Sequence, residues 1–86
     1  MNTGEYYRRA VESNPHDPDA LCELALWCTE AKFVDEGELL LSRALESNPT
    51  NADVMDALAT FFAQHRHDKE RAAELRERAE RCRQSC

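Results

Sequence analysis

The residues of this sequence best suited to chemistry are its three histidines and the two cysteines near its C-terminus. His16, His65 and His67 carry metal-binding imidazoles, and Cys82 and Cys86 lie one helical turn apart. The His65-x-His67 spacing does not direct both rings to one face of a helix, and a cysteine pair at a chain end is prone to fraying. We therefore expect helix-end and surface roles for these residues, with no metal and no cofactor.

Catalytic motifs give no stronger signal. The sequence holds no HExxH pattern, no Ser/His/Asp or Cys/His motif and no phosphate-binding loop, since glycine occurs only at positions 4 and 37. We expect a protein that is not an enzyme, whose function depends on the surface that its structural elements present.

Charge is distributed unevenly along the 86 residues, whose formal net charge is −6. Residues 14–64 carry ten acidic side chains against Lys32 and Arg43, a net of −8, whereas residues 65–86 carry seven basic and five acidic side chains, a net of +2. Nucleic acids and anionic membranes are bound mainly by clustered Lys and Arg. The acidic middle therefore argues against direct binding of nucleic acid or membrane.

Apolar stretches of the length needed for a secretory signal or a membrane span do not occur. Cys22 and Cys28 fall within an apolar helical run, where a free cysteine behaves as a small hydrophobe. We expect a soluble cytoplasmic protein with reduced thiols.

Five segments show the apolar periodicity of helices, and none alternates long enough to form a strand. Helices are expected over about 3–13, 18–31, 35–47 and 52–65 and from 69 onward, with capping residues Asn2, Asp17, Asp35, Asn51 and Asp68. The sequence therefore predicts a single all-α domain of five helices.

A seven-residue sequence occurs twice, as RAVESNP at residues 9–15 and as RALESNP at residues 43–49, a spacing of 34. Each copy ends a helix before a proline, where the α conformation is disfavoured, and the short connection makes consecutive helices antiparallel. A period of 34 built from two helices is typical of a helical repeat array. Leu24 and Leu41 are expected in the core of the central repeat.

The central unit, residues 18–51, resembles the tetratricopeptide repeat family. The consensus positions of the family are occupied here by Leu21, Leu24, Ala25, Cys28, Gly37, Leu41, Ala44 and Pro49. Leu21, Cys28 and Gly37 replace the usual tryptophan, tyrosine and alanine. The resemblance implies an antiparallel helix-turn-helix array, a fragment of an α-solenoid, that binds a partner protein as a scaffold or adaptor.

The resemblance extends to two and a half repeats. Residues 1–17 supply the second helix of a partial repeat, and residues 52–86 form a divergent repeat. In the last helix, Ala72 and Ala79 align with the family's consensus positions for small residues only if one extra residue is allowed. This alignment places Arg76 at the consensus position for an aromatic residue. Half-a-tetratricopeptide repeats share the period, so a scaffold of an RNA-processing assembly is the alternative function.

In the resembled family the first helices of successive repeats line a concave groove that holds a peptide or a partner helix. The positions that map to this groove are Asp19, Cys22, Leu26, Glu30, Asp53, Asp56, Thr60 and Gln64. None is the Lys, Arg or Asn with which chaperone-binding members clamp a partner's C-terminal carboxylates. The acids predict a partner segment that is basic or apolar, or they only solvate the surface.

The first helix offers a second surface. A complete array would cover its aromatic edge with a preceding helix, so we expect self-association through Tyr6, Tyr7, Ala10 and Val11. This association is either a two-fold homodimer or an exchange of helices between chains. Trp27 lies on an apolar helical stripe and is expected to pack between helices.

Overall fold

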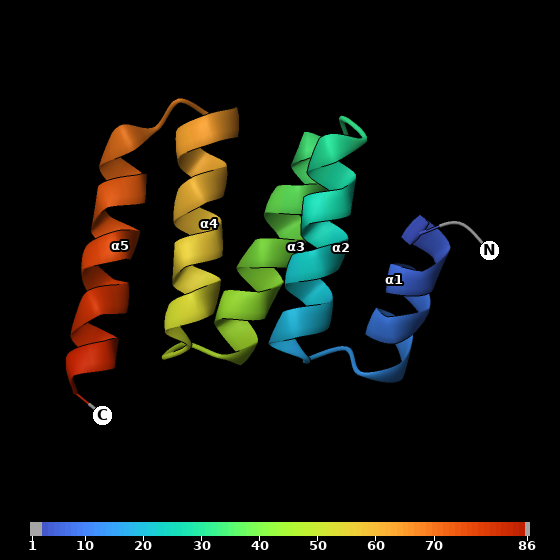
Figure 1. Ribbon diagram of the computed structural model, residues 1–86, viewed down its shortest axis with the longest axis horizontal. Helices are drawn as coiled ribbons and strands as arrows, with labels where there is room; N and C mark the ends of the chain where they lie inside the picture. Colours follow the sequence, from blue (N-terminus) through green and yellow to red (C-terminus); the bar gives the residue numbers. More distant parts are fainter. Residues whose placement is uncertain (1–2, 86) are drawn as a thin grey trace.

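The computed structural model describes residues 3–85 and folds them into helices without any strand, which confirms the predicted all-α array. The helices follow one another in chain order, each antiparallel to the next, with α1 at one end of the row and α5 at the other (Figure 1). Their bounds are α1 Thr3–Ser13, α2 Pro18–Glu30, α3 Val34–Ser47, α4 Ala52–His65 and α5 Lys69–Gln84. The Cα atoms span 40 × 29 × 15 Å, so the molecule is a slab with two broad faces. None of the described helices is long and apolar enough to cross a membrane.

Three helices begin with the side-chain caps that the sequence predicts. Asp17 and Asn51 each accept a hydrogen bond at 3.0 Å from the backbone amide two residues later. Asp68 accepts one at 3.1 Å from the amide three residues later. Each cap satisfies a donor that the first turn of a helix leaves unpaired. Of the other two expected caps, Asn2 lies outside the described residues, and Asp35 does not cap α3.

The start of α3 differs from the prediction that Asp35 opens this helix, and that prediction was wrong. The helix begins at Val34, and Phe33 holds the N-cap position without a side-chain hydrogen bond. Asp35 lies in the first turn, where a negative charge is favourable near the positive end of the helix dipole. There its carboxylate forms an ion pair with Arg66, in the turn after α4.

The end of α2 explains this early start. Lys32 has a left-handed backbone with φ of 73°, and its amide donates to the carbonyl of Thr29 at 3.1 Å. The amide of Phe33 donates to the carbonyl of Cys28 at 2.7 Å. These two bonds form a Schellman motif, which closes the helix tightly and brings Phe33 to the start of α3.

The repeated sequence forms the same turn twice. The amide of Asp17 donates to the carbonyl of Asn14 at 3.1 Å, and 34 residues later the amide of Asn51 donates to the carbonyl of Asn48 at the same distance. The two turns also contact each other, because the Asn48 side chain donates to the carbonyl of His16 at 3.2 Å. The ring of His16 contacts the hydroxyl of the helix-end residue Ser47 at 2.9 Å. His16 therefore holds successive turns together.

The buried apolar side chains form two clusters. One joins α1, α2, α3 and the start of α4, and it contains Leu24. The other joins α2, α3, α4 and α5, and it contains Leu41. Both leucines are buried as predicted, and Trp27 is partly buried against the first cluster. Because α2 and α3 contribute to both clusters, the central repeat links the two ends of the slab.

The last two helices contain the extra residue that the alignment requires. The helix α4 has 14 residues where α2 has 13, and the left-handed turn residue His67 follows Lys32 at a spacing of 35. Ala72 and Ala79 are buried in the α4–α5 pair, whereas Arg76 is exposed. With Arg76 outside, Leu75 supplies the large buried side chain of this helix.

Candidate binding groove

A hollow of about 290 Å³ lies between α2 and α4 on one face of the slab. Four of the eight groove residues expected from the sequence line it, namely Cys22, Leu26, Thr60 and Gln64. Its deeper surface includes Ala25 of α2, Leu41 of α3 and Phe61 of α4, all of them buried. The expected residues of two successive first helices therefore meet around one concave surface.

Small side chains of α2 and α4 form part of the lining of the hollow. Ala25 and Ala57 leave space that longer side chains would fill, and Leu41 of α3 closes the bottom. Leu26 stands at the wall with 60% of its surface exposed. An exposed leucine beside a concave apolar surface is suited to bind an apolar side chain of another molecule.

The ring of Phe61 is fixed from several sides. Its centroid lies 5.7 Å from that of Phe62 in an edge-on arrangement and 5.5 Å from that of His65. The guanidinium of Arg66 lies over the same ring, 5.7 Å from its centroid. These contacts hold the aromatic side of the hollow in place before any ligand arrives.

The thiol of Cys22 reports the electrostatics at one side of the hollow. Burial, and after it the nearby charges of Asp19, Asp53 and Glu23, together raise the pKa of Cys22 to about 11. The thiol is therefore neutral at pH 7 and behaves as apolar surface. The three carboxylates make the local potential negative, which favours a basic group in their neighbourhood.

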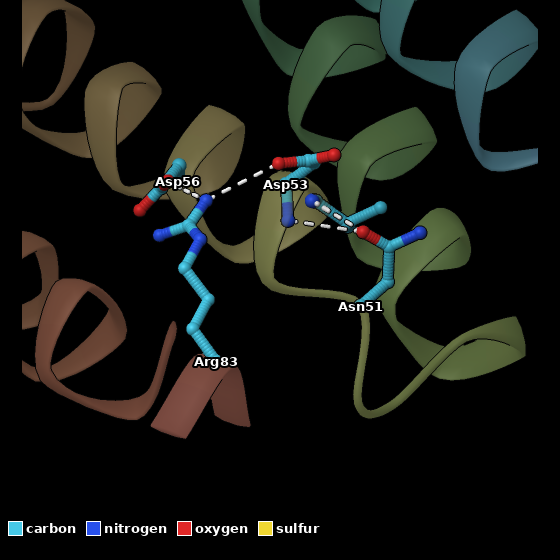
Figure 2. Close-up of polar contacts among 5 residues, drawn as sticks. Asn51, Asp53, Asp56 and Arg83 are labelled. Atoms are coloured by element: carbon cyan, nitrogen blue, oxygen red, sulfur yellow. Dashed lines mark hydrogen bonds and ion pairs between the residues drawn. The ribbon is translucent and has the colours of Figure 1, made fainter. Parts of the chain in front are cut away.

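Two of the expected groove acids are held by a contact that the sequence analysis missed. Arg83, near the end of α5, reaches back to the first two turns of α4 and lies between Asp53 and Asp56 (Figure 2). Its Nη2 atom lies 3.2 Å from Asp53 Oδ1 and 2.6 Å from Asp56 Oδ2. The hydrogen bond to Asp56 is the main reason that the pKa of Arg83 is raised. The negative charge of α4 is thus partly compensated within the chain.

The remaining groove residues lie at the two ends of α2. Asp19 is exposed in the first turn and acts on Cys22, as described above. Glu30 is exposed at the last position of the helix and does not line the hollow. The acidic side of the groove is therefore formed by the first half of α2, where Asp19 and Glu23 form no ion pair within residues 3–85.

The surface expected for self-association is smaller than the sequence suggests. Tyr6 is 61% exposed, but Tyr7 and Ala10 are partly buried against α2, and Val11 is buried with 8% of its surface exposed. Residues 7, 10 and 11 share the inner stripe of α1, so α2 covers them. Tyr6 packs edge-on against Tyr7 at 5.5 Å and is the member that faces solvent.

The histidines and cysteines are dispersed over the fold. His16 lies in the first turn, His65 at the edge of the hollow and His67 in the α4–α5 connection. Cys22 and Cys28 are free thiols, and Cys86 lies outside the described residues. Within residues 3–85, no three His, Cys, Asp or Glu side chains gather closely enough to hold a metal ion. Comparison of the chain with models of known protein families and with curated proteins finds no match.

Proposed function

We propose that this chain is a non-catalytic protein-interaction module of tetratricopeptide type, which binds a segment of a partner protein in the groove between α2 and α4. The observation that carries the proposal is the hollow itself: an apolar concave surface lined by Cys22, Leu26, Thr60 and Gln64, from two successive first helices. A concave apolar surface with a few polar groups at its edge is the usual form of a binding site.

The bound segment carries an apolar side chain next to a basic one. The apolar side chain packs against Leu26 and the buried surface of the hollow, where its burial contributes most of the affinity. The basic side chain lies near Asp19 and Glu23, whose negative potential also acts on Cys22. Opposite charge aids encounter and orientation, whereas the apolar contact sets the residence time.

The partner is a protein rather than a nucleic acid or a membrane. The acids on α2 repel phosphate, and the basic residues of α5 alternate with acids along the helix. A short groove between two helices buries a limited area, so the affinity is modest and suits a scaffold or adaptor that holds partners reversibly.

Titration of labelled peptides tests the proposal. Two peptides share a central leucine and differ only in flanking residues, lysine in one and glutamate in the other. The lysine peptide should bind more tightly, and rising salt should weaken its binding. Preference for the glutamate peptide, or equal binding of both, would contradict the proposal.

A pair of variants locates the binding surface. Asp19→Lys combined with Glu23→Lys should weaken binding of the lysine peptide by at least fivefold. Glu70→Lys combined with Glu77→Lys makes the same change of net charge on exposed positions of α5 and should leave the affinity nearly unchanged. An equal loss in both double variants would mean that net charge, and not the groove, attracts the peptide.

A further inference from the structure

A second hollow, of about 630 Å³, lies on a different surface, between α1 and α3. Among the described residues, no Cα atom of α1 lies within 8 Å of one in α3, so the hollow opens between these two helices over buried residues of α2. Leu24 and Cys28 of α2 are at its base, and Leu39 and Leu40 of α3 are at its side. This hollow shares no lining residue with the groove between α2 and α4.

Leu39 is the most exposed large apolar side chain of the described residues, with 71% of its surface in contact with solvent. It lies on an outward stripe of α3 with Glu36, Arg43 and Glu46, which border the same hollow. Leu40 also borders the hollow but is half-buried against both apolar clusters. The stripe residues are spaced by three, four and seven, which puts them on one face of the helix. The stripe therefore combines an apolar centre with charges of both signs.

The order of these residues is self-complementary. A two-fold axis between Leu39 and Leu40 that reverses the helix places position 36 opposite position 43, because both lie equally far from the midpoint. In such an antiparallel pair, Glu36 of one chain meets Arg43 of the other, twice, and the leucines meet at the centre. The stripe thus fits a second copy of itself.

We propose that two copies of this chain associate through α3, in an isologous antiparallel contact with Leu39 at its centre and with the Glu36 and Arg43 side chains paired between chains. The hollow beside Leu39 receives the facing leucine of the second copy, which removes both from water. Contacts of this closed two-fold kind are the commonest among homo-oligomers.

The charges at the rim distinguish this occupant from others. Two arginines, Arg8 and Arg43, and two glutamates, Glu36 and Glu46, border the hollow, so its rim has no net charge. A segment of one charge sign would meet repulsion from half of the rim. A standard interface takes about 800 Å² from each partner, roughly a seventh of the 5784 Å² surface of this chain. We expect a weak dimer, because one helix face forms the centre of the contact.

Sedimentation equilibrium over a wide concentration range, in reducing buffer, tests this contact. The parent chain should show a monomer–dimer equilibrium. Leu39→Asp should weaken the dimer at least tenfold, and Leu26→Asp, a matched change of a leucine exposed in the other groove, should leave it unchanged. A parent that stays monomeric at millimolar concentration would overturn the proposal, and so would a Leu39→Asp dimer as strong as the parent's.

A charge exchange separates the contact from a general effect on folding. Glu36→Arg and Arg43→Glu should each weaken the dimer, and the chain with both changes should recover it, because the exchanged charges again face each other. Failure of the double variant to recover would overturn the proposed pairing. Loss of the dimer in Tyr6→Asp, with retention in Leu39→Asp, would overturn the α3 contact in favour of the exposed edge of α1.

Discussion

The side-chain methyl of Thr29 lies 2.5 Å from the place that a β-carbon at Gly37 would occupy. A second atom, the carbonyl oxygen of Ala25, lies 3.2 Å from the same place. A β-carbon at position 37 would therefore collide with α2, so the two helices approach each other closely here. Glycine at a position where the resembled family has alanine is a requirement of this contact.

Replacing Gly37 by alanine should accordingly destabilise the fold, although alanine favours a helix by about 1 kcal/mol over glycine. Overpacking a closed contact costs about 1–3 kcal/mol, so the expected net loss is about 1 kcal/mol, several degrees in melting temperature for a chain of this size. Thr29→Ser removes the obstructing methyl and keeps the hydroxyl that donates to the carbonyl of Leu26. The double variant should melt above Gly37→Ala alone. A single variant more stable than the parent would contradict the close approach.

Leu41 tests the helix register of the central repeat. The side chain is buried in the cluster that joins α2 to α5, so Leu41→Ala should lower the free energy of unfolding by roughly 2–5 kcal/mol. A loss of this size is a large part of the stability of a small domain. Leu39→Ala on the same helix is the control, because its exposed side chain should cost little. Thermal melting of the two variants should differ clearly, and equal melting would show that the register is wrong.

The thiol of Cys22 predicts a pH dependence. Its pKa of about 11 in the folded chain lies above the ordinary value of 9.0, chiefly through burial and then through Asp19. The folded chain holds the Cys22 proton more tightly than the unfolded chain. The contribution of this thiol to the free energy of unfolding is therefore intact below pH 9 and is lost as the pH rises from 9 through 11. Alkylation of Cys22, followed by mass spectrometry, should reach half its maximal rate near pH 11.

Removing the negative charge of Asp19 should lower the pKa of Cys22. Asp19→Asn should move the alkylation midpoint of Cys22 toward lower pH, and Glu70→Gln on α5 should leave it in place. A midpoint near pH 9 in the parent chain would contradict the burial of this thiol at the groove.

Arg83 should limit the attraction of the groove for basic segments. Arg83→Gln frees Asp53 and Asp56, so a lysine-flanked peptide should bind a few-fold more tightly, while the melting temperature stays close to the parent's because exposed ion pairs contribute little to stability. Arg81→Gln makes the same change of charge on the same helix, and its guanidinium forms no ion pair within residues 3–85. Equal affinity of both variants for the peptide would contradict the compensating role of Arg83.

Local sequence signals predicted most of the fold. Asp17, Asn51 and Asp68 mark helix starts because a cap acts on amides only two or three residues away. The 34-residue period predicted the antiparallel array because a few adjacent residues determine each proline-containing turn. Such a short turn makes the helices on its two sides antiparallel. Asp35 does not mark the start of α3, because the end of α2, and not the acid itself, decides where α3 begins.

The site was predicted less completely. Cys22, Leu26, Thr60 and Gln64 were expected at the groove because the resemblance to tetratricopeptide repeats maps them there, and these four line the hollow. The contact of Arg83 with the first turns of α4 depends on how far α5 runs back along its neighbour, a tertiary relationship that spans about 30 residues. The nearly equal lengths of the antiparallel helices α4 and α5 could have indicated this contact, because the end of α5 must then lie beside the start of α4.

Backbone amide NMR of the isotope-labelled chain, titrated with the lysine-flanked leucine peptide, tests the central proposal most directly. The account predicts the largest shifts at Cys22, Leu26, Thr60 and Gln64, with little change along the outer face of α5, and predicts that Leu26→Asp abolishes these shifts while Leu39→Asp preserves them. Shifts centred on α5 or on the α1–α3 hollow, or no shifts at millimolar peptide, would contradict a binding groove between α2 and α4.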